Sequence, residues 1–338
     1  MVRVFIVDDA PFIRKALNRV LSSDPEVTVV GQAARGEEAL EMIPLCRPDL
    51  VTLDIDLPGI DGISTLIELR RMLPQLPVIM MSALAREGAE ITLNALSAGA
   101  VDFIDKTQLN MMDFHQLSAQ LLEKVRIWGN GGGVRPRNGN NGSGMATTEL
   151  DVDWSRYDLC VIGASTGGPA ALEMILTAAH ADFPAPIVIV QHMPAGFTRP
   201  FAERLDGMSA LTVREATHGA ELVPGQVLIA RSGQHLKVDK DRTVRLSRQP
   251  ADTSHRPSID VTMYSAACSL PGRRLAGILL TGMGDDGAEG MYAIHRNGGL
   301  TLAEHEDTCI VPGMPIMACK RGGVEHSLPL PAIAYLFS

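Results

Sequence analysis

The stretch LCVIGAS, residues 159–165, consists of six apolar residues followed by a serine. A short run of this kind is typical of a β-strand that is buried on both faces of a parallel sheet. Two further runs have the same form: IVIVQ at 187–191 precedes His192, and LAGILL at 275–280 precedes a glycine-rich turn with two aspartates. Because the carboxyl ends of parallel strands share one edge of an open sheet, we expect these polar side chains to meet there.

Serine, histidine and aspartate are the nucleophile, base and orienting acid that acyl transfer uses. Glycines flank Ser165 in GASTGGP, residues 163–169, and they permit a sharp turn into a helix predicted to begin near Pro169. The N-terminus of that helix suits an oxyanion. The alternative is a glycine-rich loop that binds a nucleotide or another anion, although the two standard phosphate-loop patterns are absent.

His192 favours acyl transfer, because it occupies the same strand-end location as Ser165 and is followed by Met193-Pro194, which interrupts the strand. The third group comes from TGMGDDG, residues 281–287. Spacing alone does not choose between Asp285 and Asp286. The chain order Ser, His, Asp differs from the order in α/β-hydrolases, trypsin-like enzymes and subtilisin-like enzymes.

The first part of the chain, up to about residue 128, alternates apolar runs with stretches of helical spacing. This alternation predicts a parallel sheet with right-handed crossovers, the (βα)5 flavodoxin-like arrangement. The predicted strands are Val2–Val7, Val27–Val30, Leu50–Leu53, Val78–Met81 and Val101–Ile104.

Polar residues again stand at the strand ends, in this case Asp8, Asp9, Asp54, Ser82 and Lys106. Three carboxylates at one edge repel each other unless a cation neutralises them, and a hard ion such as Mg²⁺ suits an oxygen site. The lysine provides a point charge and the serine a hydroxyl donor for an anionic ligand. The pattern predicts a site that receives a phosphoryl group on a carboxylate.

This half resembles a response-regulator receiver domain. The resemblance implies that Asp54 accepts the phosphoryl group, and that Asp8, Asp9, Asp54 and the backbone carbonyl of Asp56 hold Mg²⁺. It further implies switch roles for Ser82, Phe103 and Lys106. The family usually has proline after the lysine, whereas this chain has Thr107, which leaves the local backbone open.

The second half resembles the chemotaxis protein-glutamate methylesterase (CheB) family. The motifs that carry this resemblance are GASTGGP, QHMP, TGMGDDG, Pro224-Gly225, RPSID at 256–260 and VPGMP at 311–315. It implies a doubly wound α/β domain with a mainly parallel sheet, in which Ser165 is the nucleophile, His192 the base and Asp286 the orienting acid. Thr166 and the backbone near Met283 are then expected beside the oxyanion.

The predicted domains are a receiver at 1–128, a flexible linker at 129–152 that is rich in Gly and Asn, and a catalytic domain at 153–338. The resemblance implies demethylation of glutamate methyl esters on methyl-accepting chemoreceptors, with deamidation of receptor glutamines. A histidine kinase is the implied phosphodonor, and the unphosphorylated receiver is expected to block the active site. No cofactor is expected in the catalytic domain. The alternative is a receiver-regulated nucleotide- or anion-binding module without hydrolase activity.

Composition restricts the other functional classes. The 338-residue chain has a formal net charge of −9, and no basic stripe or helix-turn-helix pattern suggests nucleic acid as a partner. Its five cysteines are scattered without a CxxC pair, which predicts reduced thiols and a cytoplasmic protein. No signal peptide precedes the first strand and no apolar run approaches the ~20 residues of a membrane span, so no direct membrane insertion is expected.

Overall fold

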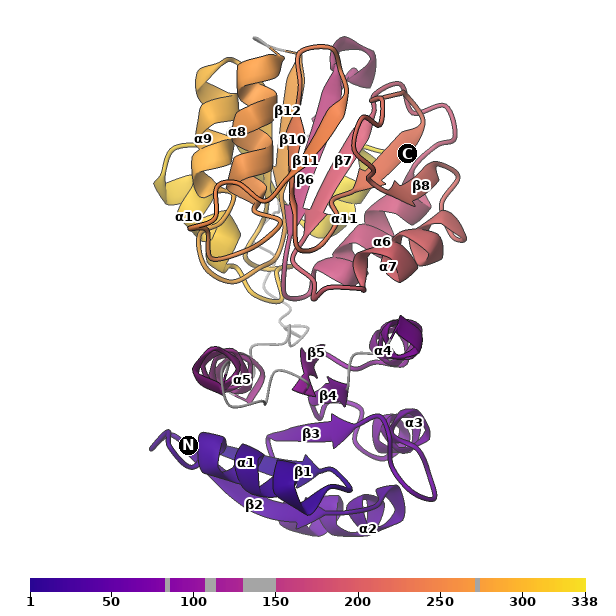
Figure 1. The fold of residues 1–338 in the computed structure, drawn as a ribbon, viewed down its shortest axis with the longest axis vertical. Coiled ribbons are helices and arrows are strands. Elements are labelled where there is room, and N and C mark those ends of the chain that lie inside the picture. Colours follow the sequence, from indigo (N-terminus) through magenta and orange to yellow (C-terminus); the bar gives the residue numbers. More distant parts are fainter. Residues whose placement is uncertain (83–85, 107–113, 130–149, 271–273) are drawn as a thin grey trace, which may run out of the picture. The chain divides into compact units, whose positions relative to one another are not determined.

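The computed structural model describes residues 1–82, 86–106, 114–129, 150–270 and 274–338. The chain divides into two compact units, Met1–Gly133 and Val134–Ser338, which are described separately (Figure 1). Most of the predicted linker, residues 130–149, lies outside the described residues. Within the described part of the chain, no helix is both long and apolar enough to span a membrane.

The N-terminal unit is a five-stranded parallel sheet with helices on both faces (Figure 1). The strands, in the spatial order β2-β1-β3-β4-β5, are β1 (Val2–Val7), β2 (Val27–Ala33), β3 (Leu50–Asp54), β4 (Val78–Ser82) and β5 (Asp102–Asp105). The helices are α1 (Pro11–Leu21), α2 (Gly36–Cys46), α3 (Gly62–Met72), α4 (Arg86–Ser97) and α5 (Phe114–Gly129). Helices α1 and α5 contact each other, as do α2 and α3. The predicted (βα)5 fold is confirmed.

The strand residues explain this arrangement. Every residue of β3 and β4 is buried, because helices cover both faces of the sheet. Strand β2 continues three residues beyond the predicted end at Val30, through Gly31 to Ala33. Gly31 belongs in the strand because the Phe5 ring lies across it: a Cβ on Gly31 would stand 2.4 Å from that ring. Gly31, which follows the predicted end of the strand, is therefore a packing position within it.

The C-terminal unit contains a seven-stranded sheet in which all pairings are parallel. In the spatial order β14-β13-β12-β6-β7-β9-β8 its strands are β14 (His326–Leu328), β13 (Leu300–Glu304), β12 (Leu275–Leu279), β6 (Leu159–Ala164), β7 (Ile187–Gln191), β9 (Gln226–Ile229) and β8 (Thr212–Glu215). A separate antiparallel hairpin consists of β10 (His235–Val238) and β11 (Val244–Ser247). The predicted mainly parallel sheet is confirmed.

Helices cover both faces of this sheet, so the unit is doubly wound (Figure 1). Helices α8 (Ile259–Ser269), α9 (Ala288–Arg296) and α10 (Gly313–Lys320) pack together on one face, whereas α6 (Gly168–Ala178), α7 (Thr198–Asp206) and α11 (Leu330–Tyr335) lie on the other. A short 3-10 helix, η2 (Trp154–Arg156), precedes β6. The central strand β6 has β12 and β7 as its two neighbours, which decides where the candidate catalytic residues lie.

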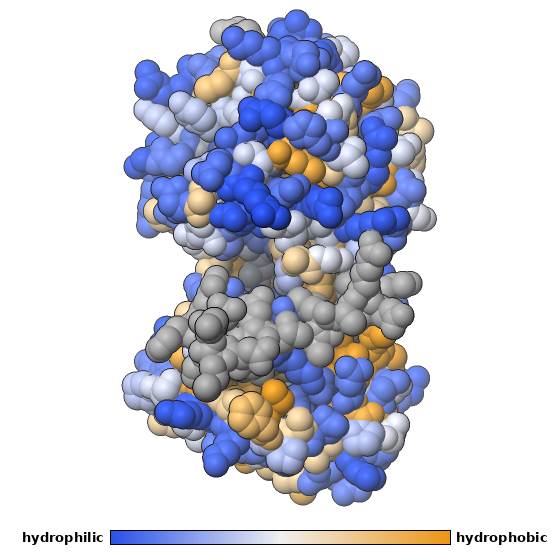
Figure 2. Space-filling view, viewed as in Figure 1, coloured by the Kyte–Doolittle hydropathy of each residue, from blue (hydrophilic) through white to orange (hydrophobic). Residues whose placement is uncertain are grey.

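The face of the molecule drawn in Figure 2 is mainly polar. On the face drawn in Figure 2, hydrophilic residues predominate and apolar ones form small groups. Among the described residues, the most exposed large apolar side chains within the elements are Leu45, Tyr335 and Phe12, which are 83%, 76% and 74% exposed and come from α2, α11 and α1. Isolated exposed apolar residues of this kind are normal on a globular surface.

Candidate catalytic and phosphoacceptor sites

Three neighbouring strands bring the serine, the histidine and the aspartates to one edge of the C-terminal sheet. Ser165 directly follows β6, and His192 directly follows β7. The His192 N–H donates to the Ala164 carbonyl (3.1 Å), and the Ser165 N–H donates to the Thr281 carbonyl (3.0 Å) beyond the end of β12. The backbone therefore fixes Ser165 between the residues that follow β7 and β12.

Asp286 is the aspartate that contacts the histidine. Its Oδ2 lies 2.8 Å from Nε2 of His192, whereas Asp285 is exposed. The beginning of α8 supplies further donors: the backbone N–H of Ile259 (2.8 Å) and of Asp260 (3.0 Å), and the hydroxyl of Ser258 (2.8 Å). Although burial opposes ionisation, the hydrogen bonds from His192 and from these backbone groups hold the pKa of Asp286 below its ordinary value. The carboxylate is therefore ionised at neutral pH.

The other ring nitrogen of His192 is free to act as a base. Its Nδ1 is buried and has no hydrogen-bond partner among the described residues. Because Nε2 donates to the Asp286 carboxylate, Nδ1 carries the lone pair. Ser165 is partly buried, and within the described structure its hydroxyl forms no hydrogen bond to the His192 ring. The two residues thus lie at adjacent strand ends, with an unpaired acceptor on His192.

Two backbone amides in the turns at Ser165 and Gly282 are candidates for binding an oxyanion. Within the part of the chain that the structure describes, no hydrogen bond uses the N–H of Thr166 or of Met283. The Thr281 hydroxyl donates to the Thr166 carbonyl (3.0 Å), which joins the two turns. A Cβ on Gly282 would lie 2.8 Å from Cβ of Ser165, so glycine is needed for this close approach. Free amides beside a serine are the groups that stabilise an oxyanion.

His255 is a site residue that sequence reasoning missed. Its ring stacks on His192 with the centroids 4.0 Å apart and the planes 5° from parallel. Although His255 is an exposed residue, desolvation of its stacked ring, together with the charge of His192, lowers the pKa of His255 to about 4, so it is neutral at neutral pH. It stands in a loop rather than at a strand end, and its only sequence signal is its position directly before the RPSID motif.

His192, His255 and Asp286 each place one potential ligand atom within 4.8 Å of the others. Nitrogen lone pairs lie in the planes of the imidazole rings. Since the two stacked rings are parallel, their lone pairs do not converge on one ion. This cluster therefore does not have the geometry of a metal site.

The N-terminal unit has its own acidic cluster. Asp8 directly follows β1, Asp54 ends β3, and both are fully buried, while Asp9 is exposed. One carboxylate oxygen from each lies within 4.8 Å of the others. Nζ of Lys106, which directly follows β5, forms an ion pair with Asp54 and lies 3.4 Å from Oδ2 of Asp8. The sequence prediction that these residues share one edge agrees with this geometry.

The cluster carries more negative charge than one lysine balances. Burial raises the pKa of Asp54 to about 6, and burial also raises the pKa of Asp8. Burial alone would lower the pKa of Lys106, but its ion pair with Asp54 raises it. Three carboxylates that offer only oxygen ligands fit a hard divalent cation such as Mg²⁺.

The remaining predicted receiver residues come from β4, from β5 and from the turn after β3. Ser82 ends β4, is buried, and pairs in register with Asp105 of β5. Phe103 is partly buried and packs against the core of the unit. The backbone N–H of Asp56, whose side chain is exposed, donates to Oδ1 of Asp54 (3.3 Å). Thr107 lies outside the described residues.

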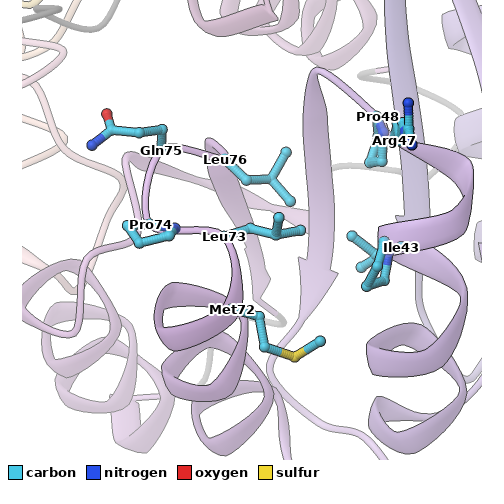
Figure 3. Close-up of a pocket in the computed structure, with 9 residues that line it drawn as sticks. Ile43, Arg47, Pro48, Met72, Leu73, Pro74, Gln75 and Leu76 are labelled. Atoms are coloured by element: carbon cyan, nitrogen blue, oxygen red, sulfur yellow. The ribbon is translucent and has the colours of Figure 1, made fainter.

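A separate apolar pocket of about 390 Å³ opens between the ends of α2 and α3. Figure 3 shows Ile43, Leu73 and Leu76 pointing into it. Its residues precede β3 and β4, so it lies at the amino ends of these strands. The acidic cluster lies at the carboxyl ends, and the pocket is therefore not part of the candidate phosphoacceptor site.

Together the two units define a response regulator whose effector is a hydrolase domain of the parallel α/β class. Residues 4–117 match the response regulator receiver domain family, and residues 160–337 match the family described as CheB methylesterase. The chain belongs to the CheB family of protein-glutamate methylesterases.

Relatives match the chain along nearly its whole length. A protein-glutamate methylesterase/protein-glutamine glutaminase of Symbiobacterium thermophilum is 41% identical over 98% of this chain and 95% of its own length. A protein of Carboxydothermus hydrogenoformans with the same description is 42% identical over 98% of this chain and 97% of its own length. The crystal structure of the Thermotoga maritima CheB methylesterase catalytic domain is 41% identical, covers 53% of this chain and 95% of that domain, and gives a TM-score of 0.51.

Proposed function

We propose that this chain hydrolyses glutamate methyl esters on methyl-accepting chemoreceptors, with Ser165 as nucleophile, His192 as base and Asp286 as orienting acid. The observation that carries the proposal is the 2.8 Å contact between His192 Nε2 and Asp286. This contact leaves His192 with a buried Nδ1 that has no hydrogen-bond partner among the described residues, and His192 follows the strand next to the one that Ser165 follows. The relatives, which are described as methylesterases and glutaminases, support the choice of substrate.

In the first half of the reaction, the Ser165 hydroxyl gives its proton to Nδ1 of His192 and its oxygen attacks the ester carbonyl. The imidazolium that forms is stabilised by the ionised Asp286, since both lie in a poorly solvated site. The N–H groups of Thr166 and Met283 stabilise the oxyanion. The proton then passes from His192 to the departing methoxy oxygen, and methanol leaves an acyl-enzyme.

In the second half, water loses a proton to His192 and attacks the acyl-enzyme. Collapse of the tetrahedral intermediate returns that proton to Ser165 and releases the glutamate side chain as a carboxylic acid, which then loses its remaining proton to water. A receptor glutamine passes through the same acyl-enzyme, with ammonia as the leaving group in place of methanol. The chain therefore also acts as a protein-glutamine glutaminase, and its catalytic domain needs no cofactor.

The receiver controls this activity. Asp54 accepts a phosphoryl group from a histidine kinase, while Asp8, Asp9, Asp54 and the backbone carbonyl of Asp56 hold Mg²⁺. When bound, the ion neutralises negative charge on the carboxylates and the phosphoryl oxygens. Lys106 pairs with the phosphoryl group, Ser82 donates its hydroxyl to it, and Phe103 changes its packing. The added charge of about −1.5 to −2 releases the block that the unphosphorylated receiver imposes on the active site.

The proposed organisation is a receiver at 1–128, a linker at 129–152 and a catalytic domain at 153–338. Each of the five cysteines is a free thiol, which supports action in a reducing cytoplasm on the cytoplasmic part of the receptors. The chain does not insert into the membrane and binds no nucleic acid.

The decisive experiment measures methanol release from methylated receptor, with and without a small phosphodonor. We expect wild-type protein to release methanol faster with the donor, and Ser165→Ala to release none. A fluorophosphonate should label the wild type but not Ser165→Ala. Unchanged hydrolysis by Ser165→Ala would reject the serine mechanism. A nucleotide that raises the melting temperature of a protein without esterase activity would favour the binding-module alternative.

A further inference from the structure

Gln191 joins the proposed nucleophile and base through its side chain. It is the last residue of β7 and is only 2% exposed. Its Nε2 donates to the Ser165 carbonyl (2.9 Å) and to the His192 carbonyl (3.1 Å). One buried amide group thus bridges the backbone of the two residues between which a proton must move.

The rest of β7 is Ile-Val-Ile-Val, and every residue of the strand is buried. A carboxamide in this position loses its contacts with water, so its burial is costly unless it forms hydrogen bonds. We propose that Gln191 is a positioning residue, whose amide fixes the distance between the Ser165 turn and the His192 turn. This inference rests on the proposed function.

The oxygen of the Gln191 amide explains why residue 168 is a glycine. Oε1 of Gln191 is buried and has no hydrogen-bond partner within the described residues. A Cβ on Gly168 would lie 2.0 Å from this oxygen. The first turn of α6 therefore packs directly against the Gln191 side chain. The orientation of the amide is also fixed, because only its nitrogen can donate to the two carbonyls.

The bridge matters because attack requires the Ser165 oxygen and the His192 base in a narrow range of geometries. The strand pairing holds the backbone only as far as Ala164 and Gln191, which are in register. Beyond this pair, among the described contacts, the His192 N–H bond to Ala164 and the Gln191 amide connect the two turns directly. Without the amide, the His192 N–H bond to Ala164 is the one direct hydrogen bond between the two turns that remains among the described residues, and the Ser165 carbonyl loses its partner from β7.

The test compares Gln191→Met with Thr301→Val in the full-length chain. Met is similar in length to Gln but donates no hydrogen bond. Thr301 is a fully buried polar residue of β13 that bonds to the Glu325 N–H (3.0 Å), away from the candidate site. Both variants should lower the melting temperature. We expect Gln191→Met to reduce kcat and the rate of fluorophosphonate labelling about 10- to 100-fold with little change in KM, while Thr301→Val keeps wild-type values.

Gly168→Ala provides a second route to the same result, because it displaces the amide while leaving Gln191 in place. If Gln191→Met does not fold, Gly168→Ala replaces it in the test. We expect Gly168→Ala to lower kcat and to keep the wild-type KM. A folded Gln191→Met or Gly168→Ala protein with wild-type kcat and labelling overturns the inference. Failure of the proposed function looks different, since Ser165→Ala would then keep its activity and the wild type would resist labelling.

Discussion

The imidazole of His255 stacks on that of His192 with an angle of 5° between the planes, and the His255 ring is neutral at neutral pH. A neutral neighbour supports the His192 ring without opposing the positive charge that His192 gains in the proposed mechanism. A protonated His255 would oppose that charge directly. His255 is therefore expected to support the base by its shape rather than by its proton.

We expect His255→Phe to retain most of the esterase activity, because phenylalanine preserves a flat ring against His192. His255→Ala should lower kcat several-fold, since the His192 ring then loses its support. Steady-state kinetics on methylated receptor would measure both. Equal loss of activity in the two variants would show that the imidazole nitrogens themselves are needed.

The same residue should affect stability in acid. The pKa of His255 in the folded protein is about 4, below the unfolded value of about 6.5. The unfolded chain therefore binds more protons between these values, and stability falls as the pH decreases from 6.5 to 4. His255→Phe should reduce this dependence. Thermal melts at several pH values would test it, and identical slopes for variant and wild type would contradict the assigned shift.

Asp286→Asn should lower kcat by about a thousandfold or more, because the amide no longer stabilises the imidazolium or fixes the protonated nitrogen. The variant should also be less stable at neutral pH. The pKa of Asp286 is lowered by folding, so its ionised form stabilises the protein above the unfolded pKa, and that contribution is lost as the pH falls. Asp285→Asn is the matched control, and this exposed neighbour should be close to wild type in both measurements.

Asp54→Asn should keep a low basal esterase rate and lose all stimulation by a phosphodonor. It should also raise the melting temperature at neutral pH. The pKa of Asp54 is raised to about 6, so the wild type loses stability as the pH rises from about 4 to 6, by at most about 3 kcal/mol. The gain from Asp54→Asn should disappear near pH 4. Stimulation of the variant by the donor would exclude Asp54 as the acceptor.

Mg²⁺ should raise the melting temperature of the full chain at pH 7.5, because it neutralises the buried carboxylates of Asp8 and Asp54. The effect should shrink below pH 6, where Asp54 is protonated. Asp8→Asn should weaken the rise in melting temperature caused by Mg²⁺, both at pH 7.5 and below pH 6. Differential scanning calorimetry over a range of Mg²⁺ concentrations measures the shift. An equal shift in wild type and Asp8→Asn would place the ion elsewhere.

The sequence predicted the central strands well, because continuous burial requires continuous apolar residues. The predicted range of β1 and the run before Ser165 agree with the structure residue for residue. The hairpin of β10 and β11 was not predicted. Its strands are short and mix buried with partly exposed residues, so they give no distinct apolar run.

The candidate site was predictable only where the strand ends determine it. Spacing did not choose between Asp285 and Asp286, because the choice depends on α8, whose first residues bind one carboxylate and not the other. His255 reaches the site from a loop, and the Gln191 amide matters through its tertiary contacts. No local pattern encodes either contact.

The start of α8 gives Asp286 two tasks in one place. The carboxylate that orients the proposed base also accepts hydrogen bonds from Ile259, Asp260 and Ser258, where a helix begins. Many enzymes sacrifice stability for their reactive groups, but here the proposed catalytic role and the start of a helix depend on the same atoms. Replacing this side chain is therefore expected to loosen the start of α8 as well as to slow the proposed reaction.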